Sequence, residues 1–231
     1  MEKMMKKWML VSLLSLPFAV NANPIELRAA GSLKNAMNDI VSAYQAASEQ
    51  TVHADFGPSG LLLKRIESGE NTDVFASANM KHPQALQAGG KGSSVVMFAR
   101  NQMCAIAQPS VKINSEGVLA AMLDPNVRLG TSTPKADPSG DYAWKIFAKA
   151  DHLQAGATAK LEAKALQLTG GENSAKAPKG RNTYAWVMEN KRADLFLTYC
   201  TNAVLAQKEV KDLQVVQLPE LLIVQILEPL L

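Results

Sequence analysis

A strand, a small-residue turn and a helix follow one another early in the chain. Residues 24–30 form an apolar run that is typical of a buried strand, and the run breaks at Gly31. From Leu33 to Tyr44, apolar side chains recur with the 3.6-residue period of a helix. Ser32 stands at the junction, where a serine commonly caps the first helical turn. Because the amides of a first turn converge and the helix dipole favours negative charge, the junction is either a plain helix cap or an anion site.

The same arrangement recurs at two later serines. Residues 51–56 alternate like a half-buried strand and lead through a Gly-Pro turn to Ser59 and another amphipathic helix. Residues 126–131 indicate a strand, which a small-residue loop connects to a helix that begins near Ser139. Alternating strands and helices predict an α/β fold with mostly parallel sheets and flanking helices. Ligands of such sheets bind beyond the carboxyl ends of the strands, which is where Ser32 and Ser59 are expected.

The rest of the chain continues the alternation. The patterns predict, in order, a strand and helix at 73–88, strands at 95–100 and 103–108, a helix from 115 to 123, a strand at 161–168, a polar loop at 170–179, a helix at 183–189, a strand that ends at Tyr199, a helix at 201–208 and a strand at 213–217.

The first 22 residues resemble a secretory signal peptide. Three lysines precede a short apolar core, and small residues follow at the expected cleavage site near Ala22. The apolar core is too short to span a bilayer, although an uncleaved anchor is the alternative. Removal of residues 1–22 takes away three lysines and one glutamate, so the formal charge falls from +3 to about +1. That charge argues against a nucleic-acid partner held by a basic surface.

Five motifs in order resemble the periplasmic molybdate-binding protein family, the substrate-binding components of molybdate ABC transporters. They are residues 28–37 (RAAGSLKNAM), 56–62 (FGPSGLL), 73–78 (DVFASA), 137–143 (DPSGDYA) and 197–203 (LTYCTNA). The resemblance runs from about Ile25 to Leu218.

The resemblance implies a two-lobe type II periplasmic binding protein fold with a crossover-strand hinge. The expected division is a signal peptide at 1–22, a first lobe at 23–102 plus 203–231, and a second lobe at 103–202. It also implies a monomeric periplasmic protein that is not an enzyme, needs no cofactor or metal ion, and delivers molybdate or tungstate to a membrane permease. Another oxyanion or a small carboxylate remains an alternative ligand.

Ligand positions carry over from the family residue by residue. Ser32 and Ser59 match the first-lobe ligands, Ser139 matches a backbone donor of the second lobe, and Tyr199 matches a tyrosine whose hydroxyl completes the shell. The remaining backbone donor falls near Arg181, where the sequence departs from the family pattern. Arg181 either turns inward and adds a bidentate positive charge or remains exposed near the start of a helix.

Other residues leave alternatives open. Cys104 and Cys200 lie near the expected crossover, and either a disulfide or two buried thiols fits that placement. A secreted serine hydrolase with Ser59 as its nucleophile is a weaker hypothesis than a binding protein, because no Gly-x-Ser-x-Gly motif surrounds Ser59. Lys135 and Asp137 could line the cleft, although loop charges are usually solvated.

The tail after Pro219 is apolar without a clear period and is too short to span a membrane. The molybdate-binding family normally continues there with another strand and a final helix. The tail is therefore expected to leave the first lobe incomplete and some apolar surface exposed.

Overall fold

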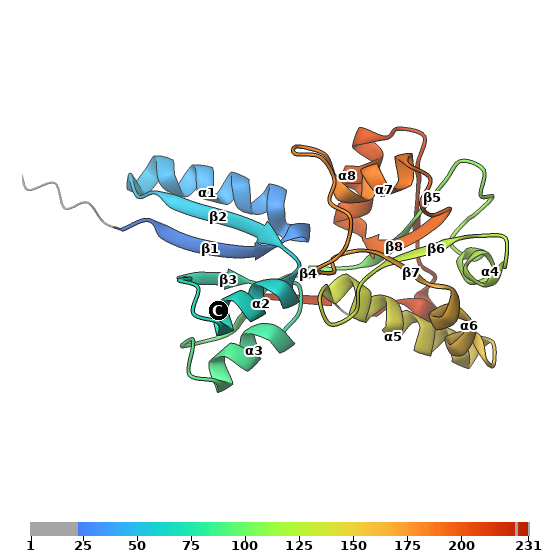
Figure 1. Cartoon of the computed structure of the whole chain (residues 1–231), viewed down its shortest axis with the longest axis horizontal. Helices are drawn as coiled ribbons and strands as arrows, with labels where there is room; N and C mark the ends of the chain where they lie inside the picture. Colours follow the sequence, from blue (N-terminus) through green and yellow to red (C-terminus); the bar gives the residue numbers. More distant parts are fainter. Residues whose placement is uncertain (1–22, 225, 231) are drawn as a thin grey trace, which may run out of the picture.

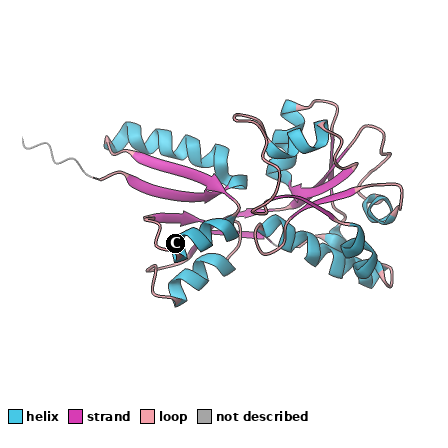
Figure 2. Cartoon of the chain, in the orientation of Figure 1, coloured by secondary structure: helices cyan, strands magenta, loops and turns pink. Residues whose placement is uncertain are grey.

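Two five-stranded sheets lie next to each other, each with helices on both faces (Figure 1; Figure 2). The structure is a computed structural model that describes residues 23–224 and 226–230. The expected signal peptide at 1–22 lies outside the described residues. None of the described helices is long and apolar enough to cross a membrane.

The first sheet combines parallel and antiparallel strands. Its strands are, in spatial order, β2 (Val52–Gly57), β1 (Ile25–Ala30), β3 (Val74–Ala76), β10 (Ile226–Leu230) and β4 (Val96–Asn101). Strand β1 is parallel to β2 and β3, whereas β10 is antiparallel to β3 and β4. Its helical elements are η1 (Gly31–Leu33), α1 (Lys34–Ser48), α2 (Ser59–Glu67) and α3 (Lys81–Ala88). Helix α1 covers one face of this sheet, and α2 and α3 cover the other (Figure 1).

The second sheet repeats this plan. Its strands are, in spatial order, β7 (Leu166–Thr169), β6 (Leu129–Ser132), β8 (Leu195–Tyr199), β5 (Met103–Ala107) and β9 (Gln214–Gln217). Strand β6 is parallel to β7 and β8, and β5 is antiparallel to β8 and β9. Its helical elements are α4 (Val118–Leu123), α5 (Pro138–Leu153), α6 (Ala157–Lys164), α7 (Thr183–Glu189), α8 (Cys200–Glu209) and η2 (Glu220–Leu222).

The chain passes twice between the sheets. The first crossover runs from β4, the last strand of the first sheet before the chain leaves it, to β5 of the second sheet, which begins two residues after β4 ends. The return runs from β9 to β10. Residues 203–217, which the sequence analysis assigns to the first lobe, contribute most of α8 and all of β9 and therefore belong with the second sheet. The pairing of β9 with β5 sets this later boundary.

The α/β architecture predicted from the sequence is confirmed, and its two-lobed form agrees with the two sheets. The strand predicted at 161–168 is wrong in its first half, because α6 occupies Ala157–Lys164; its end is confirmed as part of β7, which begins at Leu166. Alanine-rich sequence favours a helix, and Ala157 and Leu161 are the buried side chains of α6. The helix starts after Gly156, whose φ of 78° suits glycine.

The apolar tail supplies a strand that its sequence pattern did not indicate. Residues 226–230 form β10 between β3 and β4, so part of the tail completes the first sheet. The register shifts between Glu228 and Pro229, where proline has no amide to donate to the ladder.

A disulfide joins β5 to the start of α8 near the crossover. Cys104 in β5 is bonded to Cys200, the residue that directly follows Tyr199. Of the two alternatives left open by the sequence, the disulfide is therefore confirmed. The bond closes a loop with a sequence separation of 96 residues. Closing so long a loop restricts the unfolded chain and stabilises the folded one.

The double variant Cys104→Ala/Cys200→Ala is expected to lose about 2–5 kcal/mol of unfolding free energy, because the unfolded chain regains its freedom. Urea unfolding measures the change, and the reduced wild-type protein serves as a control that should behave like the variant. An unfolding midpoint equal to that of the oxidised wild type would contradict this expectation.

Candidate anion-binding site

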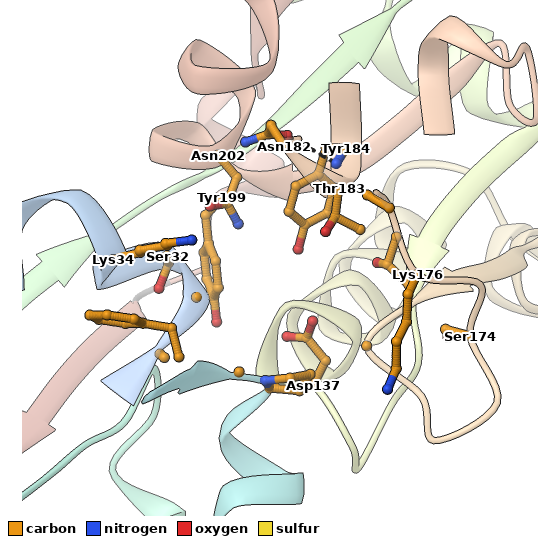
Figure 3. A pocket seen from close by; sticks show the side chains of 18 of the residues that line it. Ser32, Lys34, Asp137, Ser174, Lys176, Asn182, Thr183, Tyr184, Tyr199 and Asn202 are labelled. Carbon is orange, nitrogen blue, oxygen red and sulfur yellow. Dashed lines mark hydrogen bonds between the residues drawn. The ribbon is translucent and has the colours of Figure 1, made fainter. Parts of the chain in front are cut away.

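A cavity of about 850 Å³ lies between the two sheets. Its walls come from segments that follow β1, β2 and β3 in the first lobe and β6, β7 and β8 in the second. Most of these strands present their carboxyl ends to the cavity, as ligand sites of α/β sheets do. Figure 3 shows Asp137, Tyr184 and Tyr199 extending into this space, with Ser32 and Lys34 on the side of the first lobe.

The first lobe contributes two helix starts to the cavity. Ser32 lies in the 3₁₀ turn η1 before α1, and Ser59 is the first residue of α2. The capping role expected of Ser32 is wrong, because Ala30 precedes η1 as the cap residue. Within the described chain, neither Ala30 nor Pro58 makes a side-chain capping hydrogen bond at these starts. The first-lobe helix starts therefore face the cavity without a side-chain cap.

Ser59 is held in place by the segment that follows β3. Its side chain is buried, and its Oγ accepts a hydrogen bond of 3.1 Å from the Ala78 amide. A hydroxyl that accepts one hydrogen bond can still donate its own proton. Ser59 therefore combines a fixed position with donor capacity toward the cavity.

The second lobe caps its main helix start with a carboxylate. Asp137 precedes α5, and its Oδ1 accepts a hydrogen bond of 3.0 Å from the Ser139 amide. Ser139 is completely buried and is not among the residues that line the cavity. The amide that the sequence analysis assigns to the ligand is thus already bonded to Asp137.

The start of α7 is capped in the same way by an amide side chain. The Oδ1 of Asn182 accepts hydrogen bonds of 3.0 Å from the amides of Tyr184 and Ala185. Arg181 lines the cavity, but its guanidinium forms ion pairs with Glu189 and Glu209. Hydrogen bonds from Arg181 to these carboxylates raise the pKa of Arg181, with Glu189 contributing most. Arg181 therefore matches neither alternative from the sequence: it lies at the cavity wall, and its positive charge is balanced by Glu189 and Glu209.

A cluster of hydroxyl groups lies behind Asp137. The Oγ of Ser132 is 2.8 Å from the Oγ1 of Thr169 and 3.5 Å from the hydroxyl of Tyr184. Burial and the nearby charge of Asp137 raise the pKa of Tyr184 to about 12, so its hydroxyl keeps its proton. Burial also raises the pKa of Asp137 to about 6, although the hydrogen bonds from Ser139 and Ser132 oppose the shift. The carboxylate thus belongs to a buried polar network rather than to a solvated loop.

Tyr199 reaches from the second lobe to the first. It ends β8, is almost completely buried, and its hydroxyl donates a hydrogen bond of 3.4 Å to the carbonyl oxygen of Ala78. The ring packs edge-on against Tyr142, with 6.2 Å between ring centroids. Ala78 therefore contacts both Ser59 and Tyr199, which come from different lobes.

Further contacts bring the lobes together around the cavity. The Gly60 amide donates to the carbonyl oxygen of Ala136 at 3.1 Å. Lys64 pairs with Glu172 across the cleft at 2.8 Å, an exposed ion pair that contributes little stability. A side chain at position 60 would collide with backbone, because its Cβ would lie 2.3 Å from the Lys135 carbonyl oxygen. Glycine at position 60 permits this close approach.

The cavity gathers four of the five residues proposed from the sequence: Ser32, Ser59, Arg181 and Tyr199 line it, and Ser139 does not. Sequence reasoning gave Tyr184 no role. It allowed Asp137 to line the cleft but favoured a solvated loop charge, whereas Asp137 does line the cavity. The signal for Asp137 is its position before Pro138, where aspartate is a strong helix cap. Among the described residues, no group of three or more His, Cys, Asp or Glu side chains could hold a metal ion.

Comparison with known proteins gives related sequences and folds. Residues 25–229 match the family model described as bacterial extracellular solute-binding protein. An uncharacterized protein of Pasteurella multocida is 40% identical over 197 residues, which cover 85% of this chain and 81% of the relative. The molybdate-binding protein ModA of Escherichia coli is 30% identical over 163 residues. That match covers 63% of this chain and 62% of ModA, slightly less than two thirds of its length.

A solved structure supports the same fold assignment. The sulfate-binding protein SubI of Mycobacterium tuberculosis superposes with a TM-score of 0.68 at 16% identity, over 90% of this chain and 75% of SubI. The two lobes, the two crossovers and the cavity between them agree with this fold. The chain belongs to the family of bacterial extracellular solute-binding proteins, because the family model covers nearly all of the described residues. The members of this family are described as solute-binding proteins.

Gly60→Ala is expected to keep the lobes from closing, because the new Cβ would meet the carbonyl oxygens of Lys135 and Ala136. Overpacking of this kind costs about 1–3 kcal/mol. Small-angle X-ray scattering should show a larger radius of gyration for the variant than for the wild type. Gly89→Ala is the matched control, because its Cβ would come no closer than 3.4 Å to another atom. An unchanged radius in Gly60→Ala would show that this contact does not limit closure.

Asp137 should make stability depend on pH. Its folded-state pKa of about 6 lies above the ordinary 3.8, so the folded state holds the proton more tightly than the unfolded state. The wild type is therefore expected to lose about 2 kcal/mol relative to Asp137→Asn as the pH rises from 4.5 to 7.5, through the folded-state pKa. Urea unfolding of both proteins at pH 4.5 and pH 7.5 measures the difference. A difference that does not change with pH would mean that Asp137 titrates normally.

Proposed function

We propose that this protein captures a tetrahedral oxyanion between its lobes in the periplasm and delivers it to the membrane permease of an ABC transporter. Molybdate, with tungstate as its close analogue, is the first candidate. The observation that carries the proposal is the cavity lined by Ser32, Ser59 and Tyr199 at the meeting point of both lobes. The 30% identity to ModA of Escherichia coli supports molybdate as the ligand.

The first-lobe wall suits an anion without any metal ion or cofactor. Helix α2 begins at this wall with Ser59, and its dipole favours negative charge there. Each hydrogen bond to a charged acceptor contributes about 1.5–3 kcal/mol. Ser32 and Ser59 are the proposed hydroxyl donors of this wall.

Tyr199 is the proposed donor from the second lobe. Its present hydrogen bond to the Ala78 carbonyl oxygen is long, at 3.4 Å, and is therefore weak. An anion placed between the lobes offers a stronger acceptor for the same proton. The ligand would then contact both lobes, and its higher affinity for the closed arrangement would favour closure of a monomeric binding protein.

A larger anion is the second candidate, and the volume of the cavity favours it. About 850 Å³ lies within the range of pockets that hold drug-sized ligands and far exceeds the size of one tetrahedral ion. An organic phosphate or a small carboxylate would use more of this space. Lys34 and Lys176 also line the cavity and supply positive charge for such a ligand.

Ser32→Ala and Tyr199→Phe are each expected to weaken molybdate binding by about 1–3 kcal/mol, because each removes one donor to a charged ligand. Isothermal titration calorimetry with molybdate, tungstate, sulfate and phosphate gives the affinities. Ser42→Ala and Tyr44→Phe are matched controls, because these hydroxyls bond to the Asn38 carbonyl and to Gln50 on the exposed side of α1. Wild-type affinity in both test variants would remove Ser32 and Tyr199 from the site.

A further inference from the structure

The carboxylate of Asp137 occupies the second-lobe wall of the proposed anion site. It lines the cavity, and only 9% of the residue is exposed. Two contacts fix it there: the hydrogen bond from the Ser139 amide, and the close packing of Gly170, where a Cβ would lie 2.5 Å from that of Asp137. The side chain therefore has little room to leave the cavity when a ligand enters.

The charge of Asp137 is not balanced by an ion pair. Within residues 23–224, none of the observed salt bridges includes Asp137. The titratable or charged groups that interact with it or share the cavity with it come from α5, α7, α8, the loop after β7 and the first lobe: Asp141, Tyr184, Glu172, Lys176, Lys34, and Arg181 with its partner Glu209. Arg181 is neutralised by two glutamates, and Lys64 pairs with Glu172.

A dianion that enters this cavity meets a second negative charge in a poorly solvated place. Like charges that share such a site cannot both stay ionised, so the pair takes up a proton. A proton between a carboxylate and an oxyanion replaces repulsion with a short, charge-assisted hydrogen bond. Asp137 is also an acceptor among donors, so it can receive the O–H of a protonated anion, which a site made only of donors cannot do.

We propose that the site binds its anion together with one proton, which is held between Asp137 and the ligand. The inference rests on the proposed function, because it concerns the same cavity. The raised pKa of Asp137 supports it, since the carboxylate already holds a proton more readily than usual. Asp137 is then a specificity-determining residue that favours anions able to bring a proton near neutral pH, such as hydrogen phosphate and phosphate monoesters, over sulfate.

Proton counting tests the proposal directly. Titration calorimetry at pH 7.5 in two buffers of different ionisation enthalpy measures the protons taken up with each anion. Wild-type protein is expected to take up about one proton per molybdate, and its affinity for molybdate should fall about tenfold per pH unit from pH 7 to pH 8.5. Hydrogen phosphate, which carries its own proton, should bind with uptake close to zero.

Asp137→Asn gives the second arm of the test. Asparagine keeps the helix cap, so the fold is expected to persist while the proton site is lost. The variant should bind molybdate with no proton uptake and at least tenfold more tightly at pH 8, and it should bind phosphate more weakly than the wild type does. Asp141→Asn removes an equal charge on the same helix but not from the cavity wall, and it should retain the proton uptake.

The outcomes separate this inference from the proposed function. Binding of molybdate to the wild type without proton uptake, or loss of the uptake in Asp141→Asn instead, would overturn the role of Asp137. If none of molybdate, sulfate and phosphate binds to the folded wild type, the proposed function fails as well.

Discussion

The carboxyl ends of parallel strands from two sheets face one cavity, and the site depends on that arrangement. A loop and a helix start follow each of these strand ends. Backbone amides and short hydroxyl side chains from several segments therefore lie at the same cavity. The two crossovers and the contacts made by Gly60 and Ala78 keep the sheets close enough for both walls to reach one ligand. The disulfide next to Tyr199 fixes the base of the second wall.

The two walls differ in how their helix starts are satisfied. In the first lobe, η1 and α2 start without a side-chain cap in the described chain, and the Gly60 amide of α2 donates to the Ala136 carbonyl oxygen of the second lobe. In the second lobe, Asp137 and Asn182 accept the amides that an anion would otherwise take. The second wall therefore offers the hydroxyls of Tyr199 and Tyr184 together with one carboxylate, and this asymmetry makes the protonation state of the ligand important.

Sequence patterns predicted the fold and much of the first wall. The strand–serine–helix junctions predicted that Ser32 and Ser59 lie at the ligand edge of the sheet, and the family resemblance added Tyr199; all three line the cavity. The burial of Asp137 could not be predicted from local sequence patterns. It depends on Gly170, a residue from a separate loop, and on hydroxyls from β6, β7 and α7. The strand β10 was missed for a related reason: its position between β3 and β4 comes from pairing, not from a local pattern.

The most direct test of this account is a crystal structure with molybdate, in which the anomalous signal of molybdenum locates the ion. The account predicts one ion between the lobes, within hydrogen-bond distance of the hydroxyls of Ser32, Ser59 and Tyr199 and on the side of the cavity that faces Asp137. An ion found only on the outer surface of one lobe, or a cavity that stays without molybdenum at saturating concentration, would contradict it.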